Sequence, residues 1–201
     1  MPCSKNRILS VSSARTGKFM KDLILNIADD NRADSNQFLT FAVLGKSMAI
    51  SIDDVKEIIE IGNMTRVPMS NPCIRGVINL RGNVVPVVDL GMRLQKHLID
   101  LDKRSCIVLV ETHQQDESQV LGMLVDEVNE ILDIEPQHMQ KTPEFGTEIR
   151  PEYIEYMGRS GDEFIIVLEL DRVLAIDELA SIRQDTKAVA EVTDASIQTS
   201  A

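Results

Sequence analysis

The feature that most constrains the fold of this chain is an internal repeat. Residues 51–61 (SIDDVKEIIEI) match residues 124–134 (LVDEVNEILDI), and residues 84–90 (VVPVVDL) correspond to residues 164–170 (FIIVLEL). A chain that carries the same patterns twice, in the same order, is expected to build the same supersecondary unit twice. The repeat therefore predicts two equivalent modules.

The two modules span roughly residues 37–100 and 104–176. A module of this length buries little apolar surface, so each module is only marginally stable alone. We therefore expect the two modules to share one hydrophobic interface.

Short β-strands make up most of both modules. Apolar runs of strand length, rich in Val and Ile, occur at residues 38–44, 47–52, 74–78, 84–88, 106–110, 120–125 and 164–170. Strands this short and evenly spaced suggest small barrels. The acidic pairs Asp53–Asp54 and Asp126–Glu127 each follow such a run, where the pattern predicts a helical turn, so capping and solvation explain them.

The two ends of the chain differ from the modules. Residues 1–36 are a polar extension, in which Phe19, Met20, Leu23, Ile24 and Ile27 predict one face of a short amphipathic helix. That helix could dock on its own domain or on a partner. Residues 181–201 are rich in Gln, Asp, Thr and Ser, and we expect a C-terminal helix that frays into a tail.

The composition excludes several classes of function. The net charge of −11 argues against binding to nucleic-acid phosphates or anionic lipid. The sequence has no apolar run long enough to cross a membrane and no signal-peptide pattern, so we expect a cytoplasmic protein. Cys3, Cys73 and Cys106 lack the spacing of a disulfide framework or a zinc site.

The sequence also lacks a catalytic constellation. His97, His113 and His138 do not have the spacing of metal ligands. Gly45-Lys46-Ser47 resembles the end of a phosphate-binding loop, but Thr40 stands where that motif needs glycine, and a strand follows instead of a helix. No serine lies in a nucleophile elbow. We therefore expect a binding protein without catalytic residues, metal or cofactor.

One hairpin distinguishes the first module from the second. Two apolar runs flank residues 79–83 (NLRGN), which places Arg81 at the tip of a predicted β-hairpin, while the second module has residues 156–162 (YMGRSGD) in the corresponding region. A requirement of the fold alone would be expected in both modules. Arg81 could be a solvated turn residue, half of an ion pair, or a contact for another molecule.

The sequence resembles the CheW family of chemotaxis coupling proteins from about residue 37 to 180. The resemblance is carried by QFLTF at 37–41, SIDDVKEII at 51–59, RVP at 66–68, Pro72, IRGVINLRGNVVPVVDL at 74–90 and LGMLVDEV at 121–128. It implies a mainly β fold of two intertwined five-stranded SH3-like barrels that share a hydrophobic core, with short helices and a C-terminal helix. It also implies a non-enzymatic adaptor between chemoreceptor tips and the regulatory domain of a histidine kinase, in arrays beneath the bacterial inner membrane.

The resemblance further implies which residues face a receptor. Transferred position by position, the receptor-facing groove falls on Val55, Glu57, Ile58, Gly76, Asn79, Leu80 and Arg81. Apolar side chains in such a groove would anchor a helical hairpin of the receptor. Gly76 would let the partner approach the backbone. Arg81 and Glu57, if they face each other, would form an ion pair that positions the turn.

The kinase-facing surface is less clearly indicated. In this family it lies mainly on the second barrel, to which we assign the strand at residues 106–110, with Cys106 and Val108 as weak candidates. Alternate residues of a strand are equally expected to be core. The N-terminal extension and the hydrophilic loop at residues 113–119 are longer than a minimal coupling protein needs. They could specify a receptor class or a separate chemosensory pathway, such as one controlling twitching.

Overall fold

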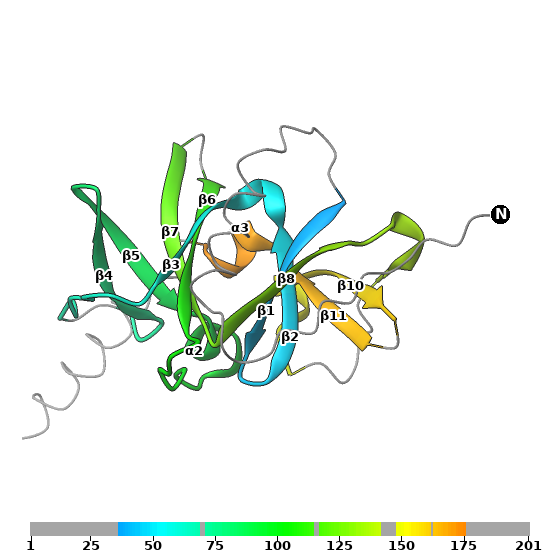
Figure 1. The fold of residues 1–201 in the computed structure, drawn as a ribbon, viewed down its shortest axis with the longest axis horizontal. Helices are drawn as coiled ribbons and strands as arrows, with labels where there is room; N and C mark the ends of the chain where they lie inside the picture. The colour runs from blue at the N-terminus through cyan, green and yellow to red at the C-terminus, as the bar shows by residue number, and fades with distance from the viewer. Residues whose placement is uncertain (1–35, 69–70, 115–116, 142–147, 162, 176–201) are drawn as a thin grey trace, which may run out of the picture.

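The structure is a computed structural model that describes residues 36–68, 71–114, 117–141, 148–161 and 163–175. Its strands are β1 (Gln37–Val43), β2 (Lys46–Ser51), β3 (Val55–Glu60), β4 (Ile74–Leu80), β5 (Asn83–Asp89), β6 (Cys106–Gln114), β7 (Glu117–Val125), β8 (Glu127–Asp133), β9 (Met139–Gln140), β10 (Ile154–Ser160) and β11 (Glu163–Leu168). The helices are α2 (Leu90–Gln95), α3 (Leu170–Val173) and the 3-10 turns η1 (Ile52–Asp54), η2 (Pro136–His138) and η3 (Pro151–Tyr153). These elements are labelled in Figure 1 where there is room.

The strands form two sheets that exchange elements between the repeats. One sheet has the order β8-β1-β2-β11-β10-β9 and the other has the order β3-β6-β7-β5-β4. The hairpin β1–β2 of the first repeat therefore lies among strands of the second repeat, and the hairpin β6–β7 of the second lies among strands of the first. The joins are parallel in both cases, β11 with β2 and β5 with β7. The mainly β fold of two intertwined units is confirmed, with a sixth strand in one sheet because the two-residue β9 is added.

The exchange corrects the placement of β6. The sequence analysis assigned residues 106–110 to the barrel opposite the Arg81 hairpin. In the structure β6 pairs with β3 and β7, so it belongs to the same sheet as the β4–β5 hairpin that carries Arg81. The sequence of a single strand does not show which sheet the strand belongs to, because both sheets contain apolar runs of this kind.

Two other expectations need correction. The pattern after each acidic pair was interpreted as a helical turn, but only residues 52–54 are helical, and β3 and β8 follow as strands. The hydrophilic loop expected at residues 113–119 is mostly the end of a long hairpin, in which His113 is opposite Ser118. In β3 a bulge between Val55 and Glu57 interrupts the strict alternation of apolar and polar residues that identifies a strand.

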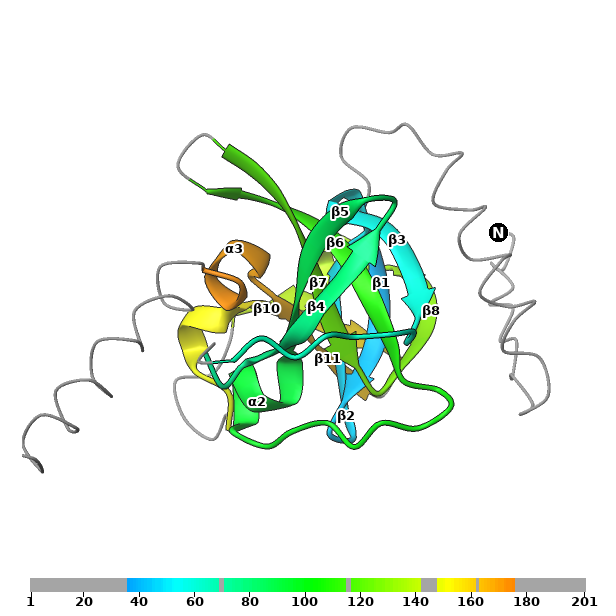
Figure 2. The same ribbon diagram turned by 90° about the vertical axis from the view of Figure 1, so that its left-hand side faces the viewer.

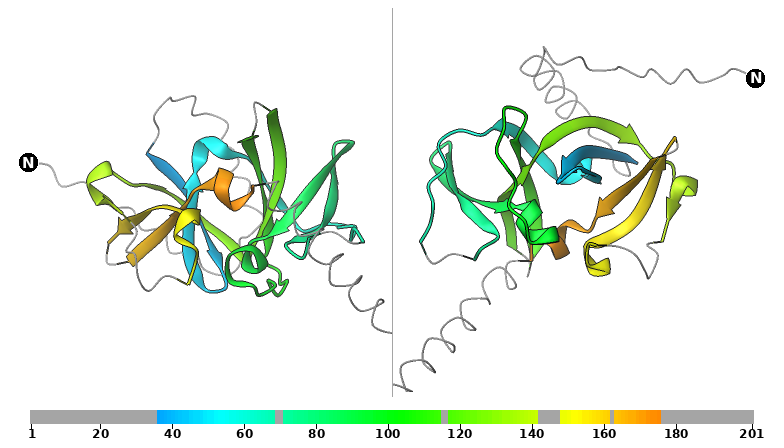
Figure 3. Two further views of the ribbon diagram at one scale, coloured as in Figure 1. Left: turned by 180° about the vertical axis from the view of Figure 1, so that it is seen from behind. Right: turned by 90° about the horizontal axis from the view of Figure 1, so that it is seen from below.

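The shared hydrophobic core lies between the two sheets and is covered by α2 and α3 (Figure 3). Its buried side chains come from both sheets and both helices and include Leu39, Phe41, Met48, Ile50, Val87, Ile107, Leu109, Leu124, Leu90 and Val173. A smaller cluster formed by Phe38, Ala49, Ile134, Ile165 and Val167 belongs to the six-stranded sheet. The expectation that the modules share one apolar interface is confirmed.

Buried polar groups join the two repeats at the helices. The carboxylate of Asp89 caps α2 by accepting from the backbone N–H of Met92 at 3.0 Å, and it also accepts from Ile99 N and from the guanidinium of Arg75. Arg93 of α2 donates from Nε to the carbonyl oxygen of Val173 at 2.7 Å. This contact satisfies a carbonyl at the end of α3 that has no partner within the helix.

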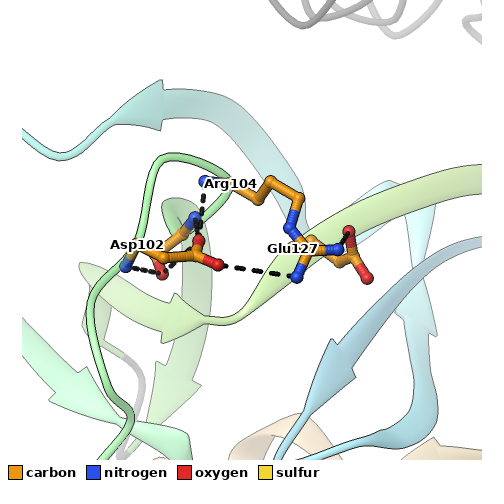
Figure 4. A network of polar contacts seen from close by, with 4 residues as sticks. Asp102, Arg104 and Glu127 are labelled. Atoms are coloured by element: carbon orange, nitrogen blue, oxygen red, sulfur yellow. Dashed lines mark hydrogen bonds and ion pairs between the residues drawn. The ribbon is translucent and has the colours of Figure 1, made fainter. Parts of the chain in front are cut away.

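The connection between the repeats is tied to the start of β8. Asp102 accepts from the backbone N–H of Arg104 and of Ser105, and the guanidinium of Arg104 pairs with Glu127 at 2.9 Å (Figure 4). The Arg104 side chain is largely exposed, so this pair contributes little to stability. Its effect is to orient the turn that leads into β6.

The predicted N-terminal amphipathic helix and C-terminal tail lie outside the described residues. None of the helices in the described ranges has the length and apolarity that a membrane crossing requires.

Candidate functional site

The predicted hairpin between β4 and β5 exists, and its tip is a tight two-residue turn. Leu80 pairs with Asn83, and the two residues between them, Arg81 and Gly82, have positive φ angles of 51° and 92°. Positive φ at both central positions is typical of a type I′ turn, whose twist matches that of a hairpin. The side-chain oxygen of Asn79 accepts from Gly82 N at 2.9 Å and fixes the turn.

Arg81 faces Glu57 of β3, as the sequence analysis proposed. Its Nη2 donates to both carboxylate oxygens, at 3.3 and 3.0 Å. The Arg81 side chain is 79% exposed, however, and that of Glu57 is 29% exposed. The pairing of Arg81 with Glu57 is therefore not a consequence of burial. An exposed pair contributes at most about 1 kcal/mol, and the rest of the guanidinium remains open to another molecule.

Glu57 and Arg81 connect the two outer strands of the five-stranded sheet, β3 and β4. Figure 2 looks onto this side of the molecule, with the β4–β5 hairpin in front and β3 beside it. We call the surface formed by Glu57, Asn79, Leu80, Arg81 and Val84 the seam. Asn79 and Val84 are exposed, and Leu80 is partly buried.

Two of the predicted anchors do not reach this surface. Val55 and Ile58 are buried and belong to the shared core. Their side chains point from β3 into the core, so a receptor could not contact them without a rearrangement of the core. Leu80 is the predicted anchor that keeps accessible surface, and the exposed Val84, which pairs with Asn79 on the other face of the hairpin, was not predicted. The sequence did not indicate that Val84 is exposed, because the buried residues of β5 belong to the same apolar run.

Gly76 has a different role from the one expected. A Cβ atom at this position would lie 2.6 Å from the carbonyl oxygen of Thr65 and 2.8 Å from Cγ of Met64. The chain that approaches the Gly76 backbone is therefore this protein's own segment after β3. The glycine is explained by internal packing.

Cys106 and Val108 of β6 are buried in the shared core. Burial raises the pKa of the Cys106 thiol to about 12, so the thiol stays protonated and is a poor metal ligand or nucleophile. Neither side chain offers a surface to a kinase. Within the described ranges, no group of three His, Cys, Asp or Glu side chains is placed to hold a metal ion.

Comparison with known proteins adds the family. The model of the CheW-like domain matches residues 37–178, which is most of the chain. The protein belongs to the CheW family. The chain is 30% identical to the chemotaxis protein CheW of Bacillus subtilis over 138 residues, covering 69% of this chain and 86% of that protein. It is 27% identical to the chemotaxis protein CheW of Klebsiella aerogenes, covering 73% of this chain and 86% of that protein.

A solved structure agrees with this assignment. The crystal structure of the scaffolding protein TtCheW from Thermoanaerobacter tengcongensis matches with a TM-score of 0.63 and 27% identity, over 71% of this chain and 90% of that one. The CheW-like fold of two sheets is thus supported by an experimental structure.

A cluster of acidic residues lies beside the start of β3 in this CheW-like domain. Burial, with smaller contributions from Asp171, Asp53 and Glu169, raises the pKa of Asp54 to about 6, while His113 opposes the shift. Burial and the same neighbourhood, Glu169 and Asp54, raise the pKa of Glu155. The cluster was not predicted, because its acidic members come from η1, from β10 and from α3 with the residue before it, which are far apart in sequence.

The Asp54 shift predicts a pH dependence of stability. The folded state binds the proton more tightly than the unfolded chain, so the contribution of Asp54 to stability is present at low pH and is lost as pH rises from about 4 through about 6. Asp54→Asn is expected to raise the free energy of unfolding at pH 7.5 by about 1 kcal/mol, a modest value because Asp54 keeps part of its surface in water. Urea denaturation at pH 5 and 7.5 measures this. A variant that is less stable than wild type at pH 7.5 would contradict the prediction.

Proposed function

We propose that this protein is a non-enzymatic chemotaxis scaffold that links the signalling tips of chemoreceptors to a histidine kinase, and so allows receptor control of the kinase. The proposed location is the cytoplasm, at receptor arrays beneath the inner membrane. Family membership and the likeness to a CheW scaffolding protein support the scaffold role. The receptor and the kinase are inferred from the family resemblance of the sequence.

The observation that carries the receptor-binding proposal is the seam. It presents the exposed guanidinium of Arg81 at the turn, and Asn79 and Val84 form an exposed pair on one face of the hairpin, while Leu80 lies on the other face against the core. An amphipathic helix of a receptor hairpin could place an apolar residue on the exposed Val84 and an acidic residue against Arg81. The second repeat has Gly161 at the tip of its hairpin, so it cannot offer the same cation.

A scaffold that holds two partners at once needs a second surface. We assign the kinase to the unit of the six-stranded sheet, which leaves the seam free for the receptor. Phe164 of β11 is the aromatic member of the exposed large apolar side chains in the described ranges, with 55% of its surface accessible, and lies on this sheet. Aromatic side chains frequently dominate protein interfaces.

The test uses two soluble probes, a helical fragment of a chemoreceptor tip and the regulatory domain of a chemotaxis histidine kinase. Wild-type protein is expected to bind each probe and to bring both into one complex in size-exclusion chromatography. Phe164→Ser is expected to weaken kinase binding by about tenfold, which is a typical loss for an interface aromatic, and to leave receptor binding unchanged. Absence of binding to both probes would refute the proposal, and unchanged kinase affinity would remove Phe164 from the surface.

A further inference from the structure

The segment that follows β3 forms a second link between β3 and β4. Thr65 and Val77 exchange backbone hydrogen bonds, from Thr65 N to Val77 O at 2.9 Å and from Val77 N to Thr65 O at 2.8 Å. We call residues 61–68 the strap. The strap crosses β4 at its middle, whereas the pair of Glu57 and Arg81 connects β3 to the tip of the β4–β5 hairpin.

At Gly76 the strap lies directly against β4. The carbonyl oxygen of Thr65 and the side chain of Met64 occupy the space that a Cβ atom at Gly76 would need. A distance of 2.6 Å between a backbone oxygen and a Cβ atom is much shorter than their van der Waals contact distance. Any side chain at this position must therefore displace the strap.

The second repeat has a comparable link, because Gln140 and Met139 of β9 pair with Met157 and Gly158 of β10, and it shows which side chain this strand position tolerates. Gly76 and Tyr156 are equivalent, because each follows the bulge in its hairpin and pairs with the corresponding residue, Val87 or Val167. Tyr156 carries a full aromatic ring, which packs edge-on against Phe38 with 5.9 Å between ring centroids. The strand therefore accepts a large side chain at this position. At Gly76 the corresponding space is occupied by Thr65 O and the Met64 side chain, so the first repeat requires glycine there.

We infer that the strap is a positioning element for the seam and that Gly76 is a positioning residue. β3 and β4 do not pair with each other, since they are the outer strands of the order β3-β6-β7-β5-β4. The strap fixes the middle of β4 against the segment that follows β3. This contact sets the angle at which the hairpin tip meets Glu57. Gly76 thus acts on partner binding through the direction of the hairpin, without contact to the partner. The inference rests on the proposed receptor-binding function.

The test compares Gly76→Ala with Gly158→Ala in the full-length protein. Gly158 of β10 is a matched control. A Cβ atom there would lie 2.9 Å from Cδ1 of Ile134, which is the far end of a flexible side chain. Both residues belong to the unit of the six-stranded sheet, away from the seam. Both variants are expected to lower stability. Gly76→Ala alone is expected to raise the hydrogen-exchange rate of the Thr65 and Val77 amides at least tenfold and to weaken binding of the receptor-tip fragment at least tenfold.

The possible outcomes separate this inference from the proposed function. If wild-type protein does not bind the receptor-tip fragment, the proposed function fails, while hydrogen exchange still shows whether Gly76 holds the strap. Unchanged exchange at Thr65 and Val77 in Gly76→Ala would overturn the inference, as would an equal loss of binding in Gly158→Ala. If Gly76→Ala does not fold, Met64→Ala replaces it, with a smaller increase in exchange at the same two amides expected.

Discussion

Replacing Arg81 with glutamate is expected to weaken binding of a receptor-tip fragment by about 30- to 150-fold, the equivalent of about 2–3 kcal/mol. The variant places a second carboxylate beside Glu57 on the seam, where an acidic partner residue would then be repelled. The melting temperature is expected to fall by less than about 4 °C, because the exposed pair with Glu57 contributes at most about 1 kcal/mol to folding. Isothermal titration calorimetry and thermal unfolding measure the two effects.

The matched control for Arg81→Glu is Arg159→Glu. Arg159 is exposed near the tip of the β10–β11 hairpin, so its substitution changes the net charge by the same amount in the equivalent part of the second repeat. Receptor binding by the control should stay within about twofold of wild type. A large loss of thermal stability in Arg81→Glu would show that Arg81 serves the fold, and an equal loss of binding in Arg159→Glu would show a general charge effect.

Asp89→Ala is expected to destabilise the protein more than any other substitution considered. The side chain of Asp89 is fully buried, caps α2 and accepts hydrogen bonds from Met92 N, Ile99 N and Arg75. Its removal leaves buried N–H groups unsatisfied and Arg75 without its counterion, which together cost about 3–5 kcal/mol. The melting temperature should fall by roughly 10 °C or more, as measured by calorimetry.

The internal repeat supplies the control for this substitution. Glu169 precedes α3 as Asp89 precedes α2, but its side chain makes no capping hydrogen bond. Glu169 also raises the pKa of Asp54 and of Glu155 by repulsion, so its removal relieves like-charge contacts. Glu169→Ala is therefore expected to be neutral or slightly stabilising. Equal destabilisation by the two substitutions would show that the buried network at Asp89 has no special importance.

Much of the fold could be predicted from the sequence because the strands in the core are apolar runs. β1, β2, β5 and β11 each lie within two residues of a predicted run, and the repeat anticipated that equivalent elements would occur twice. β3 and β8 were missed as strands. Their apolar residues are separated by two polar ones, as in a helix, and both strands contain a bulge that produces this spacing.

The seam could be predicted only in part. The pair of Glu57 and Arg81 followed from the family resemblance, and its geometry is present. The roles of Val55, Ile58 and Gly76 could not be read from the sequence, since they depend on which segment lies against each residue in three dimensions. Cys106 and Val108 illustrate the same limit, because alternation along a strand identifies two faces without showing which of them is covered.

The central claim is that this protein couples a receptor, bound at the seam of the first repeat, to a kinase. The most direct measurement is the rate of kinase autophosphorylation in a mixture of receptor fragment, kinase and this protein. Addition of wild-type protein is expected to raise the rate several-fold, and addition of Arg81→Glu is expected to leave it at the level without the protein. A rate that wild-type protein does not change, or that Arg81→Glu raises equally, would contradict the account.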